Sequence, residues 1–446
     1  MLGFYEARRV GVNLRVTMAP IAADPVQARS FARSVVDRLR DDGHEALWAG
    51  GCVRDELLGR TPADYDVATS ARPDQVRALF GRSRTLAVGA AFGVITVVGP
   101  RGSGQVEVTT FRTDADYTDG RHPAGVAYST AEEDAQRRDF TINGLFLDPR
   151  TGEVHDHVGG RADLAAGIVR AIGVPAMRFG EDHLRILRAV RFAAGFGFVL
   201  EAETRAAIER LGDRVALVSP ERIAAELRTM LSRPGRGRAL DLLAETGLAA
   251  VVFPELANSR HPGAMAADWH ARAKVVDALD ESSLAAGLAV MAEGSSSAVP
   301  GIVDRLRLSN REGATATWLR GALDACVPRG EGDSLATRPW SEVQPLMANR
   351  DASVLADVLR ARAGVHAGDG TAAREAAWVT AQVGRPRAEL DPPPLLTGND
   401  LIRAGMAPGP SLGAMLGRIR VLQLDGILAS TDDARRWLAR ADADSR

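Results

Sequence analysis

The sequence predicts an α+β fold, in which a head with a small mixed sheet precedes an all-helical remainder. Residues 45–150 alternate short β-like runs with turns, whereas alanine-, leucine- and arginine-rich stretches with helical spacing dominate from about residue 158 onward. The length of 446 residues also exceeds that of one compact domain. We therefore expect two to four domains, with the α+β head first and the helical part after it.

The composition excludes several classes of protein. A hydrophobic share of 46% excludes a disordered or collagen-like chain. No apolar run reaches the roughly 18–20 residues of a spanning helix, so no membrane contact is expected. A net charge of −2 argues against a non-specific nucleic-acid binder but leaves room for a local basic face. The two cysteines, Cys52 and Cys326, are too few for a disulfide framework and favour the cytoplasm.

The elements of the head are expected in the following order. After an N-terminal extension (1–24), a helix begins near Pro25 and runs to Leu39, because Phe31, Val35 and Leu39 share one face. Five strands follow, at ALWAGG (46–51), DYDVAT (64–69), RTLAV (84–88), GVITVVG (93–99) and QVEVTTF (105–111). The glycine-rich segment 99–104 predicts a hairpin loop between the last two strands.

Two glycines follow the first of these strands. Gly50 and Gly51 precede a short predicted helix, Val53–Leu58. Glycines at such a place let backbone N–H groups approach a phosphate closely, and the helix N-terminus adds positive potential. Arg54 lies on the first turn of that helix and can reach a triphosphate. The neighbouring Cys52 is expected to be a small core residue rather than a nucleophile.

Three carboxylates predict a metal site. Strand alternation puts Asp64 and Asp66 on one face and Tyr65 on the other. Two carboxylates that project together repel each other unless a divalent cation lies between them, and hard oxygen ligands favour Mg²⁺. Glu107, in a strand of apolar and hydroxyl residues, is the natural third ligand for a site with two Mg²⁺ ions. All three are the candidate catalytic residues.

The order strand, Gly-Gly, helix, Asp-x-Asp resembles the signature of the polymerase-β-type nucleotidyltransferases. Four later stretches are similar to motifs of the class II tRNA nucleotidyltransferase and bacterial poly(A) polymerase family. They are RRDFTING (137–144), DHVGGRADLAAGIVRAIG (156–173), RFGEDHLRILRAVRFAAGFGF (178–198) and SPERIAAEL (219–227). The resemblance covers residues 45–255 nearly continuously, and Gly144 is a small departure where the family more often has alanine.

The first of these motifs supplies candidate nucleotide contacts. Arg137 and Arg138 offer forked donors to a triphosphate or to ribose oxygens, and Asp139 can accept a hydrogen bond from a ribose hydroxyl. Asn143 of the same motif is included in the nucleotide site. The alternative for the arginines is a surface charge cluster that continues the acidic run 132–134.

The third of these four stretches, residues 178–198, suggests how the enzyme selects a base. Asp182 and Arg185 are three residues apart, hence on one face of a helix. Cytosine and adenine satisfy such a pair with an exocyclic amine and a ring acceptor, whereas uracil and guanine place a carbonyl against the carboxylate. The resemblance implies that the pair is a protein template for CTP and ATP, that Glu181 orients Arg185, and that Arg188 continues the strip.

The helical part is divided into a neck (159–257), a body (258–390) and a tail (391–446), after a head that occupies 25–158. Residues 214–240 carry six arginines, of which Arg222, Arg228, Arg233 and Arg236 are candidate RNA contacts. The resemblance implies that the body holds the elbow of a tRNA, largely by shape and backbone contacts rather than by base identity. No protein partner is evident.

The resemblance implies a CTP/ATP-dependent tRNA nucleotidyltransferase that adds or repairs the 3′-terminal CCA and releases pyrophosphate. A poly(A) polymerase and partial enzymes that add only CC or only A stay open, because the same motifs serve them all. The tail segment PLLTGNDLIRAGMAPGPSLGAML (394–416) resembles the tRNA enzymes, and a strongly basic extension typical of the poly(A) polymerases is absent. The sequence therefore favours the tRNA enzyme.

Overall fold

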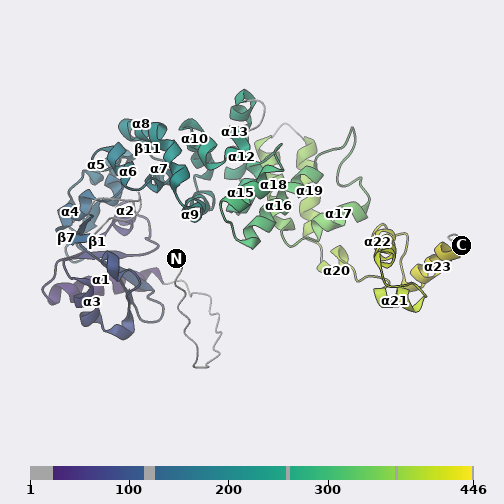
Figure 1. Cartoon of the computed structure of the whole chain (residues 1–446), viewed down its shortest axis with the longest axis horizontal. Coiled ribbons are helices and arrows are strands. Elements are labelled where there is room, and N and C mark those ends of the chain that lie inside the picture. Colours follow the sequence, from purple (N-terminus) through teal and green to yellow (C-terminus); the bar gives the residue numbers. More distant parts are fainter. Residues whose placement is uncertain (1–23, 115–125, 258–261, 367–369, 444–446) are drawn as a thin grey trace. The chain divides into compact units, whose positions relative to one another are not determined.

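The computed structural model describes residues 24–114, 126–257, 262–366 and 370–443 (Figure 1). The chain divides into two compact units, residues 1–181 and 182–446. This division falls inside the predicted neck, and the predicted boundaries at 158, 257 and 390 stay predictions. Of the predicted N-terminal extension, only its last residue, Asp24, lies within the described residues.

The first unit is built on a seven-stranded mixed sheet with the strand order β3-β4-β5-β2-β1-β8-β9. The strands are β1 (Ala46–Ala49), β2 (Asp66–Thr69), β3 (Thr85–Leu86), β4 (Val94–Val98), β5 (Gln105–Thr110), β8 (Leu145–Leu147) and β9 (Val154–Asp156). The pair β2–β5 is parallel and the other five pairs are antiparallel. All five predicted strands are present, and residues 99–104 connect β4 and β5 as the expected hairpin loop.

Helices and short strands surround this sheet. The first unit contains α1 (Pro25–Asp41), α2 (Gly51–Leu57), α3 (Pro73–Phe80), α4 (Ala131–Gln136), α5 (Gly160–Ala166), α6 (Pro175–Glu181), β6 (Arg112–Asp114), β7 (Val126–Tyr128), β10 (Ile168–Val169) and the 3₁₀ helix η3 (Thr141–Asn143). Asp24 caps α1 by accepting hydrogen bonds from the N–H groups of Val26 and Gln27. The first predicted helix is therefore confirmed and extends two residues further.

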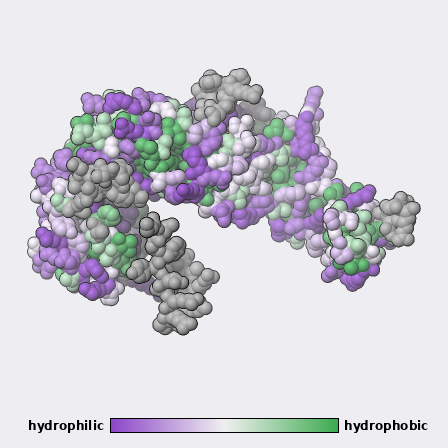
Figure 2. Space-filling view, viewed as in Figure 1, coloured by the Kyte–Doolittle hydropathy of each residue, from purple (hydrophilic) through white to green (hydrophobic). Residues whose placement is uncertain are grey.

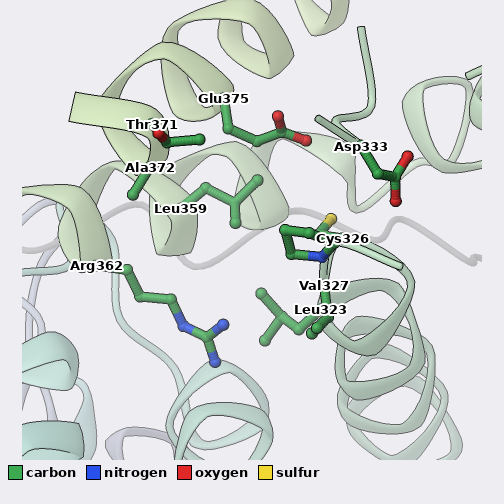
Figure 3. Close-up of a pocket in the computed structure, with 10 residues that line it drawn as sticks. Leu323, Cys326, Val327, Asp333, Leu359, Arg362, Thr371, Ala372 and Glu375 are labelled. Carbon is green, nitrogen blue, oxygen red and sulfur yellow. The ribbon is translucent and has the colours of Figure 1, made fainter. Parts of the chain in front are cut away.

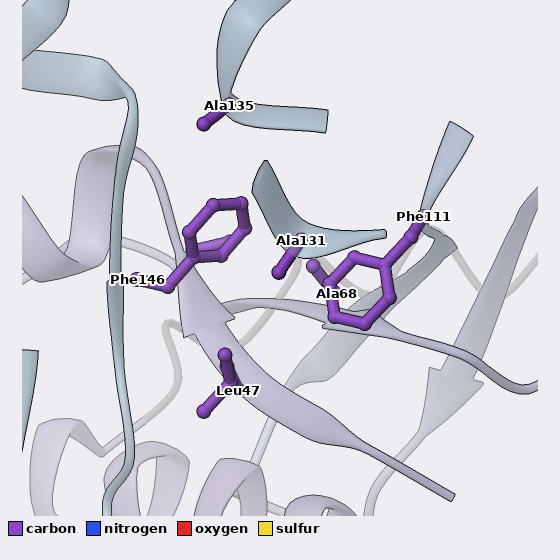
Figure 4. Close-up of a cluster of buried hydrophobic side chains, with 7 residues drawn as sticks. Leu47, Ala68, Phe111, Ala131, Ala135 and Phe146 are labelled. Carbon is purple, nitrogen blue, oxygen red and sulfur yellow. The ribbon is translucent and has the colours of Figure 1, made fainter. Parts of the chain in front are cut away.

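A small hydrophobic cluster fixes α4 against one face of the sheet (Figure 4). Phe111 and Phe146 meet edge to face, with 6.1 Å between their ring centroids. Ala131 and Ala135 of α4 pack against these rings, together with Leu47, Ala49 and Ala68 of the central strands. The small alanines let α4 approach closely, which places the arginines that follow it near the strand ends.

The second unit is helical apart from the short strand β11 (Val199–Leu200) in the described residues. Its helices are α7 (Leu184–Phe196), α8 (Ala202–Leu211), α9 (Pro220–Leu231), α10 (Arg236–Glu245), α11 (Leu248–Val252), α12 (Pro254–Ala257), α13 (Pro262–Asp277), α14 (Leu284–Met291), α15 (Ala298–Arg305), α16 (Asn310–Ala325), α17 (Trp340–Met347), α18 (Ala352–Val365), α19 (Gly370–Val383), α20 (Arg387–Leu390), α21 (Gly398–Arg403), α22 (Pro410–Leu424) and α23 (Thr431–Ala443). The last three helices enclose a core of their own around Leu401, Ile419 and Ala434. The predicted change from an α+β head to helices is confirmed.

The visible face of the molecule mixes hydrophobic and hydrophilic residues (Figure 2). On the face shown in Figure 2, hydrophobic residues form small patches between hydrophilic ones. Among the described residues, no helix is both long enough and apolar enough to cross a bilayer. Both cysteines are buried and neither forms a disulfide. Cys52 is 2% exposed, as expected for a core residue.

Candidate functional site

The sheet places two of the three predicted carboxylates side by side. In the parallel pair β2–β5, Asp66 is the register partner of Glu107. Asp64 was expected in the same strand, but β2 begins at Asp66 and Asp64 lies in a bend before it. Strand alternation therefore determines the side-chain direction of Asp66 but not that of Asp64. The position of Asp64 depends instead on the turn that leads into the strand.

The three carboxylates influence one another electrostatically. Partial burial, together with the negative charges of Asp64 and Glu107, raises the pKa of Asp66 to about 7, and only the charge of Arg138 opposes this. A bound divalent cation would relieve such repulsion, so the donor set fits Mg²⁺. Within the described residues, however, no group of three or more acidic, histidine or cysteine residues is arranged to hold a metal ion. Magnesium binding thus stays a prediction.

The structure explains why residue 50 is a glycine. Gly50 has a φ of +72°, a region that disfavours side chains, and a Cβ there would lie 2.8 Å from Nη1 of Arg138. Gly51 follows as the first residue of α2. Gly50 thus makes room for an arginine that the sequence assigns to the nucleotide. The predicted contact of the two backbone N–H groups with phosphate stays a prediction.

The guanidinium of Arg54 makes hydrogen bonds to other residues of the head. Arg54 is 8% exposed, and it donates hydrogen bonds to Oδ1 of Asn143 (2.6 Å) and to Oδ1 of Asp55 (2.8 and 2.9 Å). Asn143 in turn donates to Oδ1 of Asp139 (3.0 Å). These bonds join α2 to η3. They orient three predicted nucleotide ligands, whose direct contact with a nucleotide stays a prediction.

Sequence reasoning missed the residue that holds the two arginines of the RRDFTING motif. Asp134 on α4 is 1% exposed and accepts hydrogen bonds from Arg137 (2.6 and 2.8 Å) and Arg138 (3.0 and 3.2 Å). Burial alone would raise the pKa of Asp134, but the two guanidinium charges hold it below its usual value. The spacing i, i+3, i+4 was the available signal. The two arginines thus pair with a buried carboxylate, and their contact with a nucleotide stays a prediction.

Asp182, the carboxylate that is predicted to contact the base, pairs with an arginine of α9. Asp182 lies before α7 rather than on it, and its Oδ1 accepts a hydrogen bond from the N–H of Leu184 (3.0 Å). Its Oδ2 accepts one from Nη2 of Arg222 (2.7 Å). Arg185 follows on the first turn of α7, and its N–H donates to the carbonyl oxygen of Asp182 (3.0 Å). Arg222 was expected to contact RNA, and here it orients Asp182.

The remaining candidates also have protein partners. Glu181 accepts a hydrogen bond from Arg178 (2.9 Å), and its predicted contact with Arg185 stays a prediction. Arg188 lies 3.8 Å from Glu226. Among the predicted RNA contacts, Arg228 pairs with Glu312 (2.5 and 3.0 Å), Arg236 donates to backbone carbonyls at 276, 277 and 279, and Arg233 is exposed.

A cavity in the second unit contains none of the predicted residues. Its volume is about 200 Å³, and Leu323, Cys326, Leu359 and Arg362 contribute to its lining (Figure 3). Burial raises the pKa of the Cys326 thiol to about 12, so this thiol is not an activated nucleophile. The cavity therefore adds nothing to the carboxylate site.

Two family models match the chain. Residues 46–170 match the poly(A) polymerase head domain, and residues 197–259 match the probable RNA- and SrmB-binding site of polymerase A. These two segments are thus similar to the head and the RNA-binding region of the poly(A) polymerase family. The segment that matches the head domain contains every candidate site residue from Gly50 to Asn143. Glu181, Asp182, Arg185 and Arg188 lie between the two matched segments.

Two of the most similar curated relatives are named CCA-adding enzymes. The CCA-adding enzyme of Geobacillus stearothermophilus is 43% identical over 239 residues, which cover 53% of this chain and 58% of that enzyme. The CCA-adding enzyme of Bacillus subtilis strain 168 is 43% identical over 218 residues, which cover 49% of this chain and 54% of that enzyme. The chain thus matches a little over half the length of these relatives.

The likeness to solved structures extends over nearly the whole chain. The crystal structure of the Bacillus stearothermophilus CCA-adding enzyme in complex with CTP is 28% identical, with a TM-score of 0.72, and the match covers 96% of this chain and 99% of that one. The Thermotoga maritima CCA-adding enzyme complexed with tRNA-CCA is 21% identical, with a TM-score of 0.63 and coverage of 94% and 97%. The second likeness shows the fold alone.

Proposed function

We propose that this chain is a CTP/ATP-dependent tRNA nucleotidyltransferase that adds or repairs the 3′-terminal CCA. The observation that carries the proposal is the register of Asp66 beside Glu107 in a head of the poly(A) polymerase type. It is supported by relatives and solved structures named CCA-adding enzymes. The proposal includes a cytoplasmic location and tRNA as the partner.

The chemistry follows from the carboxylates. Asp64, Asp66 and Glu107 would hold two Mg²⁺ ions, which supply a lowered pKa at the RNA 3′-hydroxyl and neutralise the triphosphate. In-line attack of the hydroxyl oxygen on the α-phosphorus forms the new phosphodiester bond, and the bond to pyrophosphate breaks. Arg137 and Arg138, held by Asp134, would donate hydrogen bonds to the triphosphate or to ribose oxygens.

Base choice is assigned to the second unit. Asp182 would accept a hydrogen bond from the exocyclic amine of cytosine or adenine, and Arg185 would donate to the ring acceptor. Arg222 occupies one oxygen of Asp182 with a 2.7 Å hydrogen bond, and each carboxylate oxygen retains a second lone pair for the base.

The decisive experiment compares RNA acceptors. Purified protein is incubated with Mg²⁺ and with tRNA that ends before CCA, tRNA that ends before the final A, or an unstructured RNA, each with CTP, ATP or both. We expect CCA on the first and A on the second, and no activity for Asp64→Ala or Asp66→Ala. Long A-tails on unstructured RNA would make the protein a poly(A) polymerase instead, and addition of only CC or only A would make it a partial enzyme.

A further inference from the structure

The turn that carries the carboxylates has a buried aromatic residue at its centre. Along the segment 64–66, Asp64 is exposed, Tyr65 is buried at 4% exposure, and Asp66 is half-buried. Asp66 is fixed by its strand pairing with Glu107 and by the ladder of β2. Asp64 lies outside that ladder. Whatever holds the backbone of Asp64 must therefore act through the turn itself.

Tyr65 is held by contacts from two sides. Its ring packs against Trp48 of β1, which is fully buried, with 4.8 Å between the centroids at a tilt of 53°. Its hydroxyl donates a 2.9 Å hydrogen bond to Oε1 of Glu56 on α2. A phenylalanine could supply the ring packing, so the hydroxyl bond needs its own explanation.

Glu56 is in turn fixed by α1. Arg29 donates to Oε1 of Glu56 (2.8 Å) and to Oε2 (3.2 Å), in the bidentate arrangement that gives the strongest arginine–carboxylate pairs. The guanidinium of Arg29 also lies 5.2 Å from the centre of the Trp48 ring. The hydrogen bonds from Arg29 and Tyr65 hold the pKa of Glu56 below its usual value, so Glu56 accepts as a carboxylate.

The contacts among Tyr65, Glu56 and Arg29 oppose the repulsion between the three carboxylates. Asp64, Asp66 and Glu107 are like charges that push the turn away from the strand pair when no cation is present. Tyr65 is the residue between the two aspartates, and its side chain is anchored to β1 and α2 directly and to α1 through Glu56 and Arg29. Anchoring the middle residue limits how far Asp64 can move from Asp66.

We propose that Tyr65, fixed by Glu56 and Arg29, is a positioning residue that restrains the turn at Asp64 next to Asp66 before the divalent ion arrives. This rests on the proposed function in taking Asp64 and Asp66 as cation ligands and Mg²⁺ as the ion. Because the turn is restrained, less backbone freedom is lost when the cation binds, and its affinity is higher than for a free turn.

The test measures cation binding directly. Mn²⁺ binding to the nucleotide-free full-length protein is measured by electron paramagnetic resonance for the wild type, Tyr65→Phe, Arg29→Gln and Arg150→Gln. Arg150→Gln is a matched control, because Arg150 also makes an exposed ion pair with α1, through Asp37 and Asp41. We expect the dissociation constant for Mn²⁺ to rise about three- to tenfold in Tyr65→Phe, the range that loss of one hydrogen bond produces.

The other variants separate positioning from folding. Arg29→Gln should weaken Mn²⁺ binding in the same direction by a smaller factor, and Arg150→Gln should leave it unchanged. In turnover assays, Tyr65→Phe should need more Mg²⁺ for half-maximal rate but regain the wild-type KM for CTP at saturating Mg²⁺. A lower melting temperature with an unchanged Mn²⁺ dissociation constant would make Tyr65 a packing residue only and overturn the proposal.

Failure of the proposed function gives a different result. If the wild type binds Mn²⁺ through Asp64 and Asp66 but extends no RNA, the transferase assignment fails and the positioning role is still read from Mn²⁺ binding. If the wild type extends tRNA and Tyr65→Phe binds Mn²⁺ as tightly as the wild type does, the positioning role alone fails.

Discussion

At the scale of single residues, Asp66 links stability to pH. Its pKa of about 7 lies above the usual value of 3.8. The folded state therefore keeps a proton between about pH 4 and 7 that the unfolded chain releases, so this group costs stability as the pH rises through that window. Above pH 7 the cost is constant and on the order of a few kcal/mol.

Asp66→Asn should remove that cost. In metal-free buffer, the melting temperature of the variant should exceed that of the wild type at pH 8, and the difference should shrink as the pH falls from 7 to 4. Added Mg²⁺ should raise the melting temperature of the wild type more than that of the variant, because the wild type binds the ion. Equal pH profiles for the two proteins would contradict the coupling of the three carboxylates.

The side chain of Arg222 has two proposed roles, RNA binding and orientation of Asp182, and a substitution can distinguish them. The sequence assigns Arg222 to RNA, whereas the structure pairs it with Asp182 at 2.7 Å. If it orients Asp182, Arg222→Gln should lower the preference for CTP over UTP by about tenfold with little change in the KM for tRNA. Arg185→Ala should blur base choice further. A higher KM for tRNA with intact base selectivity would return Arg222 to the RNA-binding surface.

At the scale of elements, the sequence predicts what lies in a local pattern. The five strands and the first helix follow from periodicity, and the hairpin loop follows from its glycines. The bend at Asp64 was missed because a strand pattern does not show where pairing stops. The burial of Asp134 was missed because three consecutive acids look alike. The pairing of Asp182 with Arg222 spans 40 residues and depends on tertiary packing.

The contact between α9 and α16 gives a second pH-dependent prediction. The hydrogen bond from Arg228, against some burial and with help from Ser309, lowers the pKa of Glu312 to about 2. This depressed pKa contributes stability above about pH 4.5, which is lost as the pH falls toward 2. Both side chains are partly exposed, so screening limits the contribution to about 1 kcal/mol.

Glu312→Gln should therefore destabilise the protein at pH 7 by up to about 1 kcal/mol and converge with the wild type near pH 2 in chemical denaturation. Glutamine can still accept the backbone hydrogen bond of the capping box from Ser309, so α16 should keep its N-terminus. Glu342→Gln, which breaks the more exposed pair with Arg329, is the control and should change stability by less than about 0.5 kcal/mol. A constant difference at all pH values would assign the effect to packing.

At the scale of the whole molecule, the charge of the protein predicts how steeply its affinity for RNA falls as the salt concentration rises. The net charge is −2, although 54 of the 446 residues are arginine. Many of these arginines pair with acids of the same chain, as Arg222 and Arg228 do. If these pairs persist in the complex, few arginines are left for phosphate contacts, and few counterions are released on binding.

The affinity for tRNA should therefore fall only gently as salt rises. We expect a slope of log Kd against log salt that corresponds to about two to four phosphate contacts, measured by filter binding from about 50 to 300 mM KCl. Arg233→Gln, at an exposed position of the neck, should lower that slope by about one, whereas Arg150→Gln in the head should not change it. A slope equivalent to about eight or more contacts would mean that the ion pairs open on RNA and release their arginines to phosphates. The near-neutral charge would then describe the free protein and not its grip on tRNA.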